Sequence, residues 1–243
     1  IQSWWLDNAQ EVYSSPYIDG VFVDRKIKVL EDMYLKRDVG VEKKAEVKQA
    51  YNKMMKALPE TIGADKLVLA NIIRARFDDS GLTYLNYFDG SYLEAFEHNV
   101  GGVSREDYMV KGLAAMQTAA KNGKIIAFTL GMGADKADSS GIDEARGKIN
   151  SIDAVKARFD YALGLFLVCA EKHSYFLPHD GYGVDKNKSK FWMKDIPEFG
   201  YRLGAPSGPA KKKGYVYTRN FKHAKVWVDL ESEKAKIVWD DAL

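Results

Sequence analysis

The chain has 243 residues, 46% of them hydrophobic and 29% charged, so it is long enough for one large α/β domain or two small ones with a buried core. Its 36 Lys and Arg residues against 34 Asp and Glu residues give a net charge of +2, which argues against a general nucleic-acid binder. The single cysteine, Cys169, excludes an internal disulfide and a cysteine-based metal cluster, and no run is long and apolar enough to span a bilayer.

Short β-rich runs alternate with longer segments of helical spacing. The first helix has an apolar stripe from Val47 to Leu58 and is expected to end at Pro59 and Gly63. Ser104, three residues before Asp107, is typical of an N-cap, and a helix to about residue 121 is predicted after it. An apolar helix is expected near 152–171. The predicted strands are residues 20–24, 67–71, 90–94, 124–129 and 174–177.

Strands that alternate with helices at this spacing predict parallel βα units, whereas residues 214–239 read as antiparallel strands. Residues 202–213 are interpreted as the connecting loop, with Lys211, Lys212 and Lys213 in a solvated turn. We therefore expect a (β/α)-barrel domain over residues 1–203 and an antiparallel β segment over 204–243 that packs on it.

Five βα units are too few for an eight-stranded barrel of the TIM (β/α)8 type, which needs about 250 residues. Either the first strands are missing from this chain or the sheet is open. The chain begins at Ile1 without a methionine, which favours missing strands, and a missing N-terminal part of the same barrel is then an expected partner. The oligomeric state is left open. No signal peptide is visible, but such a start says little about compartment, and a periplasmic or extracellular location is favoured.

Two predicted strands share one sequence motif, which consists of Asp-Gly, three further residues and then an acid. Residues 19–24 read Asp-Gly-Val-Phe-Val-Asp and residues 89–94 read Asp-Gly-Ser-Tyr-Leu-Glu. Because side chains alternate along a strand, Asp24 and Glu94 are expected to point into the barrel at the carboxyl ends of their strands, where barrel enzymes keep their active sites. The alternative is ion pairing of Asp24 with Arg25 or Lys26, and of Glu94 with Arg74.

Two facing carboxylates are what glycoside hydrolysis needs, since one protonates the leaving oxygen while the other attacks the sugar or activates water. Glu94 is the expected general acid because its side chain reaches further, and Asp24 the nucleophile or base. No cofactor or metal site is predicted, because the four histidines lack ligand spacing. The substrate-binding residues that we expect from strand ends and following loops are Arg25, Asn71, Arg74, Tyr92, Phe128, Tyr175 and Trp192.

These residues resemble a known family. The segments 19–24 and 89–94, with Tyr217-Thr218-Arg219-Asn220-Phe221 and Val226-Trp227-Val228-Asp229, are similar to a family of hypothetical glycoside hydrolases with a (β/α)8 barrel. The resemblance covers nearly the whole chain and implies that strands four to eight end at Asp24, Asn71, Glu94, Phe128 and Tyr175. More distantly, the chain resembles the endo-α-1,4-polygalactosaminidases, in which the acids after strands four and six are the catalytic groups, which implies Asp24 and Glu94.

Three interpretations remain open. The first is a glycoside hydrolase that acts on a polysaccharide or oligosaccharide, and the second is a noncatalytic carbohydrate-binding barrel. The third is a polysaccharide lyase, which the cations Arg25, Arg74, Arg76 and Lys172 near strand ends would suit. The distance between the two carboxyl groups separates the first interpretation from the others.

Overall fold

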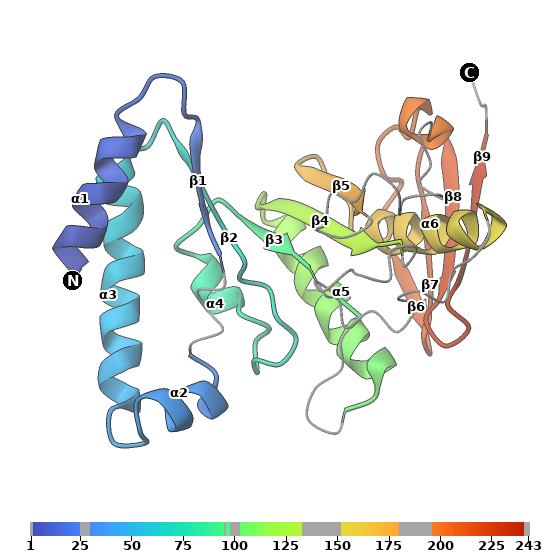
Figure 1. The fold of residues 1–243 in the computed structure, drawn as a ribbon. Coiled ribbons are helices and arrows are strands. Elements are labelled where there is room, and N and C mark those ends of the chain that lie inside the picture. Colours follow the sequence, from blue (N-terminus) through green and yellow to red (C-terminus); the bar gives the residue numbers. More distant parts are fainter. Residues whose placement is uncertain are drawn as a thin grey trace. The chain divides into compact units, whose positions relative to one another are not determined.

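A computed structural model describes residues 2–24, 30–94, 96–97, 103–132, 152–179 and 196–240. The chain forms two compact units, Ile1–Tyr92 and Leu93–Leu243, which are described in turn (Figure 1). This division lies far upstream of the boundary at residues 203 and 204 that the sequence pattern suggested.

The first unit contains three parallel strands with helices between them. Strand β1 pairs with β2 in the register Gly20↔Leu67 to Val23↔Ala70, and β2 pairs with β3 through Leu69↔Gly90. One face of this sheet is buried, as the fully buried Val68, Ala70 and Ser91 show. The elements are α1 Gln2–Tyr13, β1 Gly20–Val23, α2 Asp32–Asp38, α3 Lys44–Ile62, β2 Leu67–Ala70, α4 Leu82–Leu85 and β3 Gly90–Leu93, the last of which crosses the division.

Helix α3 follows from the predicted apolar stripe, of which Tyr51, Met55 and Leu58 are buried. The helix is longer than predicted, because Pro59 lies inside its last turn and does not end it. Pro59 has no backbone N–H to donate to the carbonyl four residues earlier, yet the helix continues for three residues beyond it. Helix α3 ends at Ile62, and Gly63 follows with φ of 100°, a conformation that glycine tolerates. Helix α1, which lies beside α3 in Figure 1, was not predicted.

The second unit combines a parallel strand pair with an antiparallel sheet. Strands β4 and β5 pair in the register Ile126↔Ser174 to Gly131↔His179. Helix α5 begins as predicted, since the Ser104 hydroxyl accepts a hydrogen bond from Asp107 N at 3.1 Å. The elements are α5 Arg105–Lys121, β4 Ile125–Gly131, α6 Ile152–Leu167, β5 Ser174–His179, the 3₁₀ helix η2 Pro197–Gly200, β6 Lys211–Lys213, β7 Val216–Asn220, β8 Ala224–Asp229 and β9 Lys234–Trp239.

The C-terminal sheet has the order β6-β7-β8-β9, and every pair is antiparallel, as predicted for residues 214–239. The prediction of a turn at Lys211–Lys213 was wrong, because these residues form the edge strand β6 and pair with Val216 to Thr218. An edge strand has one side open to water, so lysines fit there despite their low β propensity.

Helix α6 packs on β8 and β9 of this sheet, and also contacts β5 (Figure 1). The closest approach is at Gly164, where an added Cβ would lie 2.7 Å from Val228 Cγ2 and 2.8 Å from Ala235 Cβ. Any larger residue would push the helix off the sheet.

The fold is therefore mixed α/β, with all five predicted parallel strands and the predicted antiparallel sheet present among the described residues. A closed TIM barrel is not confirmed, since five such strands do not close one. In the part of the chain that the structure describes, no helix is long and apolar enough to cross a membrane.

Candidate active site

Asp24 and Asn71 lie side by side at the carboxyl edge of the first unit's sheet. Asp24 follows β1 directly and Asn71 follows β2, and Asn71 N donates to the Val23 carbonyl at 3.1 Å. The Asn71 side chain is buried, and its Nδ2 lies 3.5 Å from Asp24 Oδ1, a long hydrogen bond. This contact joins two residues that the sequence places at the carboxyl ends of neighbouring strands. Asp24 itself is exposed, so solvent or a ligand reaches its carboxylate.

Ser91, which the sequence reasoning missed, holds the chain that follows Asn71. The Ser91 hydroxyl oxygen accepts hydrogen bonds from Ile72 N at 3.2 Å and from Ile73 N at 3.0 Å. Ser91 is fully buried on β3, so these bonds tie the loop after β2 to the neighbouring strand. The only signal in the sequence was a small polar residue on the apolar face of a predicted strand.

The Asp-Gly part of the repeated motif has a structural role. A Cβ on Gly20 would lie 2.2 Å from the Leu67 carbonyl oxygen, so only glycine lets β1 approach β2 here. Asp89 Oδ2 accepts a hydrogen bond from Val68 N at 2.7 Å and so fixes the start of β2. The acids that end the two segments, Asp24 and Glu94, are the groups that we consider for chemistry.

Aromatic side chains lie on the uncovered face of the same sheet. Phe22 and Tyr92 form an edge-to-face pair with ring centroids 5.3 Å apart, and Phe22 is 51% exposed. Phe22 shares a strand face with Asp24, since the two residues are two positions apart. Sugars expose C–H groups that pack on such rings, and Phe22 was not among the predicted binding residues although this spacing could have identified it.

Glu94 follows β3 directly and is half-buried. It belongs to the second unit, whereas Asp24 belongs to the first. The predicted facing of the two carboxylates across a barrel mouth therefore stays a prediction.

The remaining predicted binding residues differ in their surroundings. Tyr175 on β5 is 60% exposed and its ring is open to a ligand, whereas Phe128 is buried. The Phe128 ring stacks on Phe166 and Phe176 with centroids 6.5 and 6.1 Å away, because its strand position faces the helical layer. The Phe128 ring packs in the core, and its contact with a sugar stays a prediction that this burial does not favour. Arg25 and Trp192 lie outside the described residues, as does the alternative partner Lys26.

Two arginines near strand ends have well-defined surroundings. Arg74 is half-buried, and its backbone N–H donates to the Ser80 carbonyl at 2.9 Å, which closes the loop after β2. Arg76 Nη1 donates to Glu31 Oε2 at 2.7 Å, and both side chains are largely buried. Arg76 therefore has a structural partner, which weakens the lyase interpretation at this position.

The second unit holds a buried ion pair that the sequence reasoning missed. Arg158 on α6 donates two hydrogen bonds to the Glu97 carboxylate, one of them at 2.9 Å, and its Nε donates to the Gly131 carbonyl at 3.1 Å. Sixty-one positions separate the two residues, so no local sequence pattern predicts the ion pair. The Arg158 guanidinium thus donates to a carboxylate and to a backbone carbonyl, and these bonds fix the end of β4 on α6.

The described residues show no group of three or more His, Cys, Asp or Glu side chains that could hold a metal ion. Cys169 is buried, and burial raises the pKa of its thiol well above the ordinary value. A thiol with such a pKa is a poor nucleophile at neutral pH.

Comparison with known proteins gives a match over most of the chain. A family model described as hypothetical glycosyl hydrolase family 15 matches residues 1–225. Among curated proteins, the comparison found no match.

Proposed function

Because the chain belongs to hypothetical glycosyl hydrolase family 15, we propose that it hydrolyses O-glycosidic bonds of a polysaccharide or oligosaccharide with Asp24 and Glu94 as its carboxylate pair. The observation that carries the proposal is the edge where β1 and β2 end. An exposed carboxylate, Asp24, stands there beside a buried amide, Asn71, 3.5 Å away, and solvent-accessible aromatic rings lie on the same sheet.

Glu94 is the proposed general acid, and its proton goes to the oxygen of the leaving sugar. Asp24 then attacks the anomeric carbon or removes a proton from the attacking water. Carboxyl groups about 5–5.5 Å apart would give a retaining reaction, and a separation of roughly 6.5–9.5 Å an inverting one. In both cases Asp24 must stay ionised while Glu94 is protonated before the bond breaks.

Asn71 supports the proposed role of Asp24 in two ways. Its side-chain amide donates toward Asp24 Oδ1, which limits the rotation of the carboxylate. The amide can also reach a sugar hydroxyl bound against Asp24. Phe22 and Tyr92 would pack on the apolar face of a sugar ring, and Arg74 and Tyr175 remain proposed substrate contacts.

The test is hydrolysis of a polysaccharide panel by the parent and by Asp24→Asn and Glu94→Gln variants, with release of reducing ends as the readout. Each amide keeps the shape of the side chain but cannot transfer the proton or attack, so turnover should fall on the order of a hundredfold to ten-thousandfold. Glu60→Gln and Asp65→Asn are matched controls, because both acids are exposed and precede the amino end of β2. Amide variants that hydrolyse glycans at the parental rate would remove the two acids from the mechanism.

A noncatalytic carbohydrate-binding protein is the second candidate, which the accessible Phe22 and its pair with Tyr92 favour. The same panel separates the two functions. A binding protein would retain a glycan on which it releases no reducing ends, and the Asp24→Asn variant would then bind as the parent does.

A further inference from the structure

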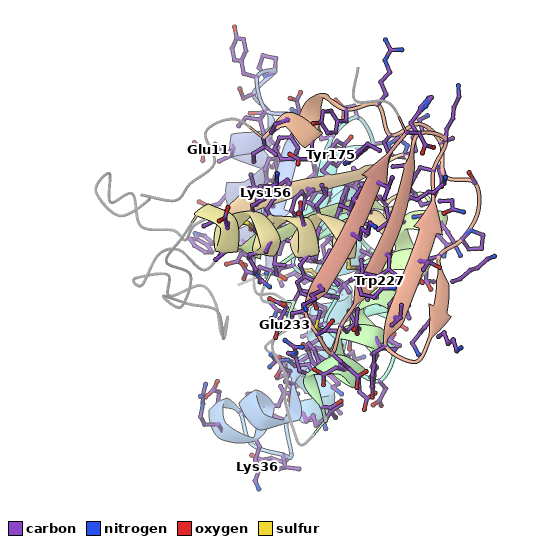
Figure 2. The ribbon with its side chains drawn as sticks, turned by 90° about the vertical axis from the view of Figure 1, so that its right-hand side faces the viewer. Glu11, Lys36, Lys156, Tyr175, Trp227 and Glu233 are labelled. Atoms are coloured by element: carbon purple, nitrogen blue, oxygen red, sulfur yellow. The ribbon has the colours of Figure 1, made fainter. Side chains whose placement is uncertain are left out.

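The outer face of the C-terminal sheet carries a tryptophan that is surrounded by lysines. Figure 2 looks onto this sheet and labels Trp227 on it. The strand register places Lys211, Thr218, Trp227 and Lys236 in one row across β6, β7, β8 and β9. Opposite residues in a row share a face, and all four side chains are exposed. We call this set the Trp227 row.

The rows on either side add more positive charge. Lys213, Val216, Asp229 and Lys234 form one of them, and Asn220, Lys225 and Val238 form the other. The face therefore holds five lysines: Lys211, Lys213, Lys225, Lys234 and Lys236.

The acidic groups on this face are Asp229, which belongs to one of the two flanking rows, and Asp240 beside Lys225. The Asp229 carboxylate accepts hydrogen bonds from the Ser232 hydroxyl at 2.6 Å and from Glu231 N at 3.0 Å. The Asp240 carboxylate lies 3.8 Å from Lys225 Nζ. Among the described residues, Lys211 and Lys236 have no carboxylate within 4 Å. The Trp227 row is thus a cationic line with an aromatic ring inside it.

The inner face of the same sheet packs in the core. This packing does not account for the residues of the Trp227 row on the outer face. Val226 and Val228 point inward and are buried, and α6 covers that side. Trp227 points outward with 37% of its surface exposed, so it contributes little to the core. A strand position that faces only water is usually occupied by a polar residue, as it is at Thr218 and Lys236 on the neighbouring strands.

A pocket of about 280 Å³ opens at the β6 end of the row. It is lined by Ser207, Gly208 and Pro209 of the preceding loop, and by Lys211, Thr218, Arg219 and Asn220 of β6 and β7. Its lining combines polar and apolar atoms in similar proportion, and two of its residues belong to the Trp227 row. This volume is near the lower end of small-molecule sites, which suits one sugar ring at the end of a chain that crosses the strands.

We infer that this face binds an acidic polysaccharide, with the Trp227 ring against the apolar face of one sugar and Lys211 and Lys236 paired with carboxylates on either side. The inference rests on the proposed function, which makes a glycan the natural ligand. Neighbouring strands lie about 4.8 Å apart, so the row presents groups at a repeat comparable with the length of one sugar unit. A single-stranded nucleic acid would need successive rings to stack its bases, and the row has one.

The experiment measures binding of the full chain to polygalacturonate by affinity gel electrophoresis, with dextran and single-stranded DNA as comparison probes. All proteins carry the Asp24→Asn substitution, so that hydrolysis cannot consume the probe. Polygalacturonate should retard the protein and dextran should not. Trp227→Ala should weaken retardation by about tenfold, which corresponds to the loss of one stacking contact. Trp227→Phe should keep most of the affinity because it keeps a ring.

A Lys211→Gln/Lys236→Gln variant should bind more weakly and lose much of its salt dependence, because it forms fewer ion pairs. Trp4→Ala and Lys53→Gln/Lys56→Gln are the matched controls, since these exposed residues lie on α1 and α3 of the first unit. Circular dichroism checks that each variant is folded.

Three results would overturn the inference: no retardation by polygalacturonate, parental retardation of the Trp227→Ala variant, or tighter binding of single-stranded DNA than of polygalacturonate. The glycan panel described above tests hydrolysis separately. Failure of the proposed catalytic pair would therefore appear there, and failure of the Trp227 face would appear here.

Discussion

Arg219 is the residue whose removal should most weaken the second unit. Its guanidinium is almost fully buried and donates four hydrogen bonds. Nη1 donates at 3.2 Å to the carbonyl of Leu167, the last residue of α6, and at 2.6 Å to that of Ala170, three residues beyond the helix. Nη2 donates to Glu171 Oε1 at 2.5 Å, and Nε to the Gly208 carbonyl at 3.2 Å. One side chain thus satisfies the end of α6 and joins it to the C-terminal sheet.

The magnitude follows from what Arg219→Ala leaves behind. Two backbone carbonyls and a partly buried carboxylate lose their donors, and breaking a buried ion pair costs about 3–5 kcal/mol. For a unit of this size, 1 kcal/mol corresponds to roughly 2–4 °C in melting temperature, so we expect a fall of about 10 °C. Arg219→Lys should lose about half as much free energy, because an ammonium keeps the charge but not the planar fork of donors.

Urea denaturation followed by circular dichroism measures the free energy of unfolding of these variants. Lys212→Ala is the control, since Lys212 is exposed on the adjacent strand and should change stability by less than about 0.5 kcal/mol. The paired variant Arg219→Met/Glu171→Leu should recover part of the loss, because it removes the stranded carboxylate as well. An Arg219→Ala protein within about 1 kcal/mol of the parent would refute the reasoning, because buried pairs that break cost more.

Two further predictions concern α6. Gly164→Ala should cost about 1–3 kcal/mol of unfolding free energy by overpacking against the sheet, whereas Gly200→Ala, where no atom lies within 4 Å of the new Cβ, should be nearly neutral in the same urea titration. Burial, with the charge of Glu198, raises the pKa of the Asp160 carboxyl above its ordinary value of 3.8. An acid with a raised folded-state pKa stabilises the fold below its unfolded pKa and loses that contribution as pH rises through the folded pKa. Asp160→Asn should therefore melt at a higher temperature than the parent at pH 7 and at the same temperature near pH 3, and equal melting at both pH values would contradict the raised pKa.

The sequence predicted the parallel strands well because they are short runs rich in apolar residues, four of which end in a polar residue. Alternation with period two then placed Asp24 and Asn71 at one edge, and their contact is present. The burial of Phe128 was not predicted, because the apolar residues 125–128 do not mark which face of the strand is buried. Strand β6 was missed because its pairing with β7 depends on neighbours and is invisible in a run of lysines.

What the sequence could not predict depends on residues far apart in the chain. Ser91 supports the loop after Asn71 from a position 18 residues beyond Ile73, and Arg158 meets Glu97 across 61 residues. Arg219 lay in a segment that carried the family resemblance, but its contacts with the end of α6 give it a structural role. Local sequence patterns indicate which face of a helix or strand a residue occupies. Its contact partner from a distant part of the chain is known only from the structure.

The position of α6 has a consequence for how the second unit comes apart. This helix contacts β5 on the parallel side and lies on β8 and β9 through the close approach at Gly164. Removal of residues 204–243 would bare the apolar surface of α6 and leave the carbonyls at and just beyond its end without Arg219. The helix and the antiparallel sheet should then lose amide-exchange protection together, as one cooperative element, and a protease that cuts near residue 203 should release no stable fragment on either side.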